Sequence, residues 1–262
     1  MDLWNILFSI VLLALALSPL AFIVDAFNLG VSAALAMLCL FLPIFLSEPF
    51  AICLAAGPVA IYLMLFGAVN LAKRPFVVSG SRDFAVLALA AAGLVVVGPM
   101  ELFFPMVASL RFGANVWIML LALYVLLVIC LILFFRPRLV IYNIAMEELR
   151  PILADLTPRL DPDARWAGDS LSLPGLGVQL HLDCVAKMRN VSLVSSGPAQ
   201  NHQGWRKLEL ALQAALAEVE VPRNVRAVGL VSAAAIILLF LVVAVSGDPQ
   251  SVAQAILDMF WA

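Results

Sequence analysis

Residues 115–143 read NVWIMLLALYVLLVICLILFFRPRLVIYN, and this stretch contains both kinds of structure that the chain is expected to adopt. The part 115–135 carries no charge and is long enough to cross the hydrocarbon core of a bilayer, which takes about 20 apolar residues. Arg136 and Arg138 follow at once, and 138–143 is a short run of β-favouring residues. The stretch therefore predicts a membrane helix that leads directly into a folded domain.

The composition of the whole chain is that of a membrane protein. Of its 262 residues, 65% are apolar and 12% are charged, whereas soluble domains are about 45–50% apolar and about 25% charged. The fold class expected is an α-helical integral membrane protein of about six transmembrane helices, at 4–24, 29–46, 50–72, 84–104, 115–135 and 227–246. The span 29–46 is short and contains Pro43, so a re-entrant or tilted segment is the alternative there.

The positions of the cations predict an orientation. Loops that stay in the cytoplasm keep an excess of Lys and Arg, and no cation precedes Lys73 in this chain. With the loops after 50–72 and 115–135 inside, fourteen of the fifteen cations are cytoplasmic and Arg111 alone is outside. We expect a bacterial cytoplasmic membrane, a C-terminus outside, and an N-terminus outside if 29–46 crosses.

Residues 136–226 have the composition of a soluble domain, with eleven Lys and Arg against ten Asp and Glu. The expected organisation is membrane helices in 1–135, a cytoplasmic α+β domain of order β-α-β-β-β-α in 136–226, a last membrane helix at 227–246, and an outer amphipathic tail at 247–262. Two helices are predicted by apolar residues at spacings of three and four: Leu149, Ile152, Leu153, Leu156 and Leu160, then Trp205, Leu208, Leu212, Leu216 and Val219.

Three further strands are expected at about 165–173, 176–185 and 188–196. The first two form a hairpin in this interpretation, because Pro174 and Gly175 favour a turn between them. Apolar residues alternate with polar ones along 176–185, as in a strand with one buried face. His181 and Asp183 are then on the exposed face.

One pair of ionisable residues is a candidate site at the membrane edge. Glu101 stands between Pro99 and Pro105, and Arg111 is the single cation expected outside. A carboxylate at membrane depth is a candidate proton or cation site. The alternative, which we favour, is an interfacial carboxylate that pairs with Arg111.

The soluble segment contains metal-ligand residue types but no complete ligand set. His181, Asp183 and Cys184 are close in sequence and His202 is the other histidine, while a structural zinc site needs four ligands. Neither a glycine-rich phosphate loop nor a nucleophile motif is present. We therefore expect no metal, no cofactor and no catalytic residue. The balanced charge of the segment argues against a nucleic acid partner.

The function expected is that of a noncatalytic accessory or scaffold subunit of a membrane complex, whose cytoplasmic domain docks a partner. Its partners would be the lipid bilayer and other proteins, or copies of itself, because Ala-rich stretches such as ALALAAAGLVVVG allow helices to approach closely. Packing within one chain explains those stretches equally well. The alternative function is a small-solute or ion transporter or channel with a regulatory cytoplasmic domain.

Overall fold

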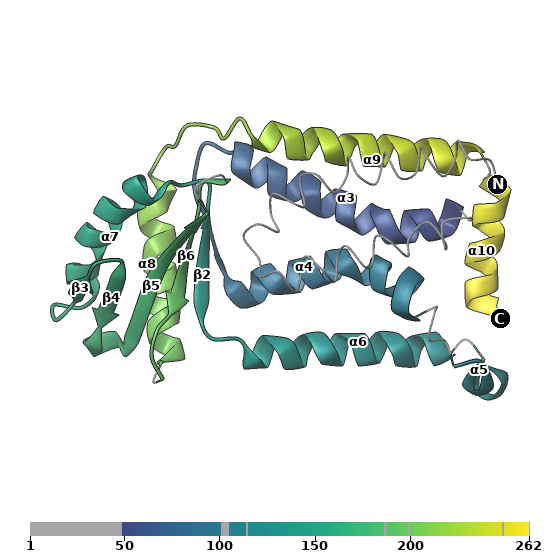
Figure 1. Cartoon of the computed structure of the whole chain (residues 1–262), viewed down its shortest axis with the longest axis horizontal. Helices are drawn as coiled ribbons and strands as arrows, with labels where there is room; N and C mark the ends of the chain where they lie inside the picture. Colours follow the sequence, from purple (N-terminus) through teal and green to yellow (C-terminus); the bar gives the residue numbers. More distant parts are fainter. Residues whose placement is uncertain are drawn as a thin grey trace. The chain divides into compact units, whose positions relative to one another are not determined.

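The structure is a computed structural model that describes residues 49–100, 105–113, 115–185, 188–198, 200–247 and 249–261 (Figure 1). The predicted spans 4–24 and 29–46 lie outside the described residues, as does Glu101. The chain divides into two compact units. The first takes its described residues from 1–65, 87–130 and 229–262, and the second consists of 66–86 and 131–228.

Four described helices are long and apolar enough to cross a membrane, which indicates a membrane protein. They are α3 (Pro49–Leu71), α4 (Gly80–Val95) with its π-helical continuation (Val96–Met100), α6 (Asn115–Phe134) and α9 (Ala227–Gly247). Their positions agree with the predicted spans 50–72, 84–104, 115–135 and 227–246. The total of six spans stays a prediction.

The helices of the first unit approach one another closely at glycine. A Cβ on Gly93 of α4 would lie 1.8 Å from the carbonyl oxygen of Leu54 in α3, so the two backbones are in direct contact there. Between α4 and α6, the Tyr124 hydroxyl donates to the Ala88 carbonyl at 2.7 Å. Small residues allow such contacts in lipid. At Gly93, therefore, the small-residue stretch serves packing within the chain.

The end of α4 is not regular. Residues Val96–Met100 form a π-helical turn that contains Pro99. Proline lacks the amide hydrogen that the α-helical ladder needs, and a wider turn accommodates this loss. Two shorter helices follow the α4 and α9 segments: α5 (Met106–Phe112) and α10 (Pro249–Trp261). The latter occupies the tail in which the sequence predicts an amphipathic helix.

The second unit contains an antiparallel sheet of six strands in the order β1-β2-β6-β5-β4-β3. The strands are β1 (Phe76–Ser79), β2 (Arg138–Tyr142), β3 (Arg165–Ala167), β4 (Ser170–Leu173), β5 (Val178–Val185) and β6 (Asn190–Ser195). Helices α7 (Met146–Leu160) and α8 (His202–Ala217) belong to the same unit (Figure 1).

The sheet differs from the prediction at two places. Strand β1 comes from the connection between α3 and α4, where no strand was expected, and it pairs with β2 from Phe76↔Tyr142 to Ser79↔Leu139. The run 165–173 is two strands rather than one, because Gly168 adopts a φ of +63° and starts a two-residue turn between β3 and β4. Glycine at the first position of such a turn is typical of a type II′ hairpin.

One hydrophobic core joins α7 and α8 to one face of the sheet. Leu149 and Leu153 from α7 and Leu208, Leu212 and Leu216 from α8 are completely buried, so both predicted apolar stripes are confirmed. The predicted alternation in β5 is also correct. Val178, Leu180 and Leu182 are buried, whereas Gln179, His181 and Asp183 are exposed.

Strand β2 is buried on both of its faces. Leu139 and Ile141 belong to the core, and Val140 and Tyr142, which alternate with them, are buried as well. The Tyr142 ring packs edge-on against Phe66 in α3, with ring centroids 5.3 Å apart. Its hydroxyl donates to the Asp83 carboxylate in α4. The end of α3 and the start of α4 therefore cover the second face of the sheet at β2.

Buried asparagines tie the sheet to the end of α3 and to the segment that precedes α9. Asn143, at the end of β2, is fully buried and donates through Nδ2 to the Ala72 carbonyl at 2.6 Å. Asn224 donates through Nδ2 to the Met188 carbonyl at 3.0 Å, and its backbone N–H donates to the carbonyl of the buried Asn70 at 3.3 Å. We call Asn70, Asn143 and Asn224 the asparagine junction.

Candidate functional site

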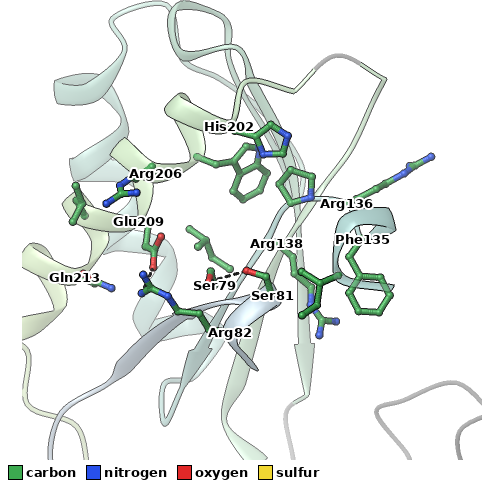
Figure 2. A pocket seen from close by; sticks show the side chains of 15 residues that line it. Ser79, Ser81, Arg82, Phe135, Arg136, Arg138, His202, Arg206, Glu209 and Gln213 are labelled. Carbon is green, nitrogen blue, oxygen red and sulfur yellow. Dashed lines mark hydrogen bonds and ion pairs between the residues drawn. The ribbon is translucent and has the colours of Figure 1, made fainter. Parts of the chain in front are cut away.

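A cavity of about 370 Å³ lies within the second unit (Figure 2). Its size is at the lower end of the range of about 300–1,000 Å³ that is typical of small-molecule sites. Three walls surround it, formed by α8, by the β1–α4 connection, and by the connection from α6 to β2. Residues far apart in the sequence therefore meet at this place.

The α8 wall presents one face of an amphipathic helix. His202, Arg206, Glu209 and Gln213 recur at spacings of three and four and line the cavity (Figure 2), while Leu208 and Leu212 on another face belong to the core. Asn201 caps this helix by accepting a hydrogen bond from the Gln203 N–H at 2.9 Å. The cap fixes where α8 begins.

The opposite wall comes from the end of β1 and the first turn of α4. Ser79 and Ser81 have their hydroxyl oxygens 3.3 Å apart. Arg82 turns its guanidinium toward Glu209 across the cavity, with a nitrogen–oxygen distance of 3.6 Å (Figure 2). The Arg82 side chain is 69% exposed, so solvent screens this pair and it contributes little stability.

The third wall is the passage from α6 into β2. It contributes the apolar residues Ile132 and Phe135 and the cations Arg136 and Arg138. The Arg138 guanidinium lies 3.7 Å from the Asp83 carboxylate. A Cβ on Gly80 would lie 2.1 Å from Cγ of Arg138, so the absence of a side chain at Gly80 provides the space that the Arg138 stem occupies.

The cavity is basic although the segment 136–226 is nearly balanced in charge. In the part of the chain that the structure describes, its lining contains Arg82, Arg136, Arg138 and Arg206 but one carboxylate, that of Glu209. The sequence interpretation missed this site, because it took the charge of the segment as a whole and because Arg82 belongs to a different part of the chain. The arginines that stand next to the ends of the apolar runs were the sequence feature that could have indicated this basic site.

The histidines of the sequence analysis lie apart. His181 is on the exposed face of β5, where its Nδ1 is 3.1 Å from the Ser170 hydroxyl. His202 lines the cavity from the first turn of α8. This helix packs against the buried face of the sheet. Asp183 and Cys184 are exposed on β5. Within the described ranges, no group of three or more His, Cys, Asp or Glu side chains is placed to hold a metal ion.

The membrane-edge pair of the sequence analysis stays a prediction. Arg111 is exposed in the last turn of α5, whereas Glu101 lies outside the described residues. No family model, curated protein or solved structure matches the chain.

Proposed function

We propose that this protein is a noncatalytic accessory or scaffold subunit of a membrane complex, and that its α+β domain docks a partner on the cytoplasmic side of a bacterial cytoplasmic membrane. One observation carries the proposal. Each of the four apolar helices has one end in the unit that contains the sheet: residues 66–71 of α3, 80–86 of α4, 131–134 of α6 and 227–228 of α9.

The directions of the four helices are consistent with a domain that lies on one side of the membrane. They are the C-terminal ends of α3 and α6 and the N-terminal ends of α4 and α9, as expected for helices that cross in alternating directions. Seven cations lie at or close to these ends: Lys73, Arg74, Arg82, Arg136, Arg138, Arg223 and Arg226. The excess of cations at these ends favours the cytoplasmic side.

The four helix ends belong to the same unit as the sheet, so the proposed docking surface is built together with them. The asparagine junction holds this unit together, because buried hydrogen bonds between side chains and backbone resist local separation. Strand β1 adds to it, since this strand connects α3 to α4 and is also part of the sheet.

The surface proposed for docking is the exposed face of β5 and its neighbours. Gln179, His181 and Asp183 alternate with core residues and are exposed, and Ser192 lies opposite Asp183 in the register. The side chains of Gln179, His181 and Asp183 on this face are polar. They suit hydrogen bonding to a partner, and the interface of a non-obligate complex is about as polar as the remaining surface.

Photo-crosslinking in native membranes tests the proposal. The photoreactive residue p-benzoyl-phenylalanine replaces His181 on the sheet face or, as the control, Arg159 on the exposed side of α7, where Arg159 pairs with Asp155 in the same helix. We expect a discrete adduct with another protein from position 181 and none from position 159. Equal adducts from both positions, or no adduct from either, would overturn the docking surface.

The transporter or channel hypothesis has a different signature. It requires a water-filled path to the middle of the membrane, and solute flux in vesicles that contain the purified protein alone. A flux that depends on the protein, together with no adduct from position 181, would replace the scaffold proposal by the alternative.

A further inference from the structure

We propose that the basic cavity binds a phosphate group, carried either by the headgroup of an anionic lipid or by a small soluble phosphate ester. This inference goes beyond partner docking and does not depend on it, because the cavity is formed by α8, the β1–α4 connection and the start of β2 and not by the exposed face of β5. The ligand class follows from the charge, the hydrogen-bonding groups and the size of the cavity.

The charge of the lining favours an anion. Among the described residues, the lining contains four arginines and one carboxylate, that of Glu209. The pair Arg82–Glu209, at 3.6 Å between nitrogen and oxygen, is longer than a hydrogen bond. Among the residues that the structure describes, no carboxylate lies within 4.0 Å of Arg136 or Arg206. Positive charge from the lining attracts an anion to the cavity.

The hydrogen-bonding groups favour phosphate over a simple monovalent anion. Guanidinium groups donate in a planar fork that matches two oxygens of a phosphate. The hydroxyls of Ser79 and Ser81 lie on the wall from which Arg82 comes and are further donors. Gly80 and Ser81 stand in the first turn of α4, whose backbone N–H groups have no partner within the helix.

The shape of the cavity favours a single phosphate group over a nucleic acid backbone. A volume of about 370 Å³ accommodates one headgroup-sized molecule, whereas a nucleic acid needs an extended basic track. The lining also contains Phe135 and Leu210, whose exposed fractions are 42% and 58%. Apolar groups beside cations suit the glycerol portion of a lipid or the carbon skeleton of a phosphate ester.

Binding measured on the full-length protein tests this inference. The soluble probes are inorganic phosphate and glycerol 3-phosphate, titrated by calorimetry against protein in detergent at constant ionic strength. The lipid probe is phosphatidylglycerol, compared with phosphatidylcholine, and its retention on the protein is counted by native mass spectrometry. Saturable binding of a soluble probe indicates a phosphate ester, and selective retention of phosphatidylglycerol alone indicates a lipid headgroup. Either result supports the site.

Two neighbouring cations on α8 provide a matched pair of variants. Arg206 lines the cavity, whereas Lys207 is exposed and does not. We expect Arg206→Gln to weaken binding of the active probe about tenfold to a hundredfold, as for the loss of a charge-assisted hydrogen bond. Lys207→Gln is expected to change it less than about twofold, since it removes only a screened surface charge. The proposal is overturned if the two variants weaken binding equally, or if no phosphate probe binds.

Discussion

The asparagine junction makes its sharpest prediction at Asn143. This residue is completely buried, has a φ of +60°, and donates from Nδ2 to the Ala72 carbonyl at 2.6 Å. Two substitutions separate the contribution of the backbone conformation to stability from that of the hydrogen bond. Asn143→Gly removes the hydrogen bond but accepts the positive φ, whereas Asn143→Ala removes the hydrogen bond and forces a Cβ-bearing residue without a polar side chain into that conformation.

The magnitudes follow from the two contributions. A buried carbonyl that loses its donor costs about 1–3 kcal/mol of unfolding free energy. Alanine in the left-handed region costs roughly 1–2 kcal/mol more. We therefore expect Asn143→Gly to destabilise the domain by about 1–3 kcal/mol and Asn143→Ala by about 2–5 kcal/mol. Glycine also increases the conformational entropy of the unfolded chain, which destabilises the glycine variant. The difference in unfolding free energy between the two variants is therefore expected to be about 1 kcal/mol.

The assay is urea titration of the full-length protein in detergent, with a brief pulse of protease at each concentration to digest unfolded domain. For a slope of about 1–3 kcal/mol per molar urea, the expected losses move the midpoint by roughly 0.3–5 M. Equal midpoints for the alanine and glycine variants would refute the role of the backbone conformation. Midpoints equal to that of the unchanged protein would refute the junction itself.

Two further predictions concern helix packing and the second face of β2. Gly93→Ala is expected to destabilise the protein by about 1–3 kcal/mol in a thermal melt, because the new Cβ meets the Leu54 carbonyl oxygen. The control Gly229→Ala is expected to be neutral or stabilising, since nothing lies within 4 Å of its Cβ. Equal effects of the two substitutions would contradict the close contact between α3 and α4. Tyr142→Phe removes the hydroxyl that donates to Asp83 and is expected to cost about 1–3 kcal/mol by the urea assay. In an Asp83→Ala background, which has no acceptor at this place, this cost should fall, and full additivity would contradict the pair.

Local periodicity predicted much of the fold. The apolar runs predicted the positions of α3, α4, α6 and α9. A helix that crosses a membrane needs about 20 apolar residues with few charges, and such a run can be recognised directly in the sequence. The stripes of α7 and α8 and the alternation of β5 were also readable, since each element buries one face at its own period.

Other features depend on contacts that periodicity does not encode. Strand β1 has four residues and follows Pro75, so it resembles a loop, and only its pairing with β2 makes it a strand. The turn at Gly168 did have a local signal, because Gly168-Asp169 is a dipeptide typical of a two-residue hairpin turn, but the sequence interpretation read 165–173 as one strand. The cavity was missed because Arg82 and Glu209 are far apart in the sequence and meet only in the folded unit. The net charge of a whole domain does not reveal that several arginines line one cavity.

Thiol labelling tests the central claim, that a membrane protein presents this α+β domain to the cytoplasm. Cys184 is exposed on β5, and Ala253 is exposed on α10, beyond α9. Variants with a single thiol, either Cys184 or the one introduced by Ala253→Cys, are treated with a membrane-impermeant maleimide in spheroplasts and in inside-out vesicles. The account predicts that Cys184 is labelled only in inside-out vesicles and the introduced thiol only in spheroplasts. Labelling of both from the same side, or of Cys184 in intact spheroplasts, would contradict it.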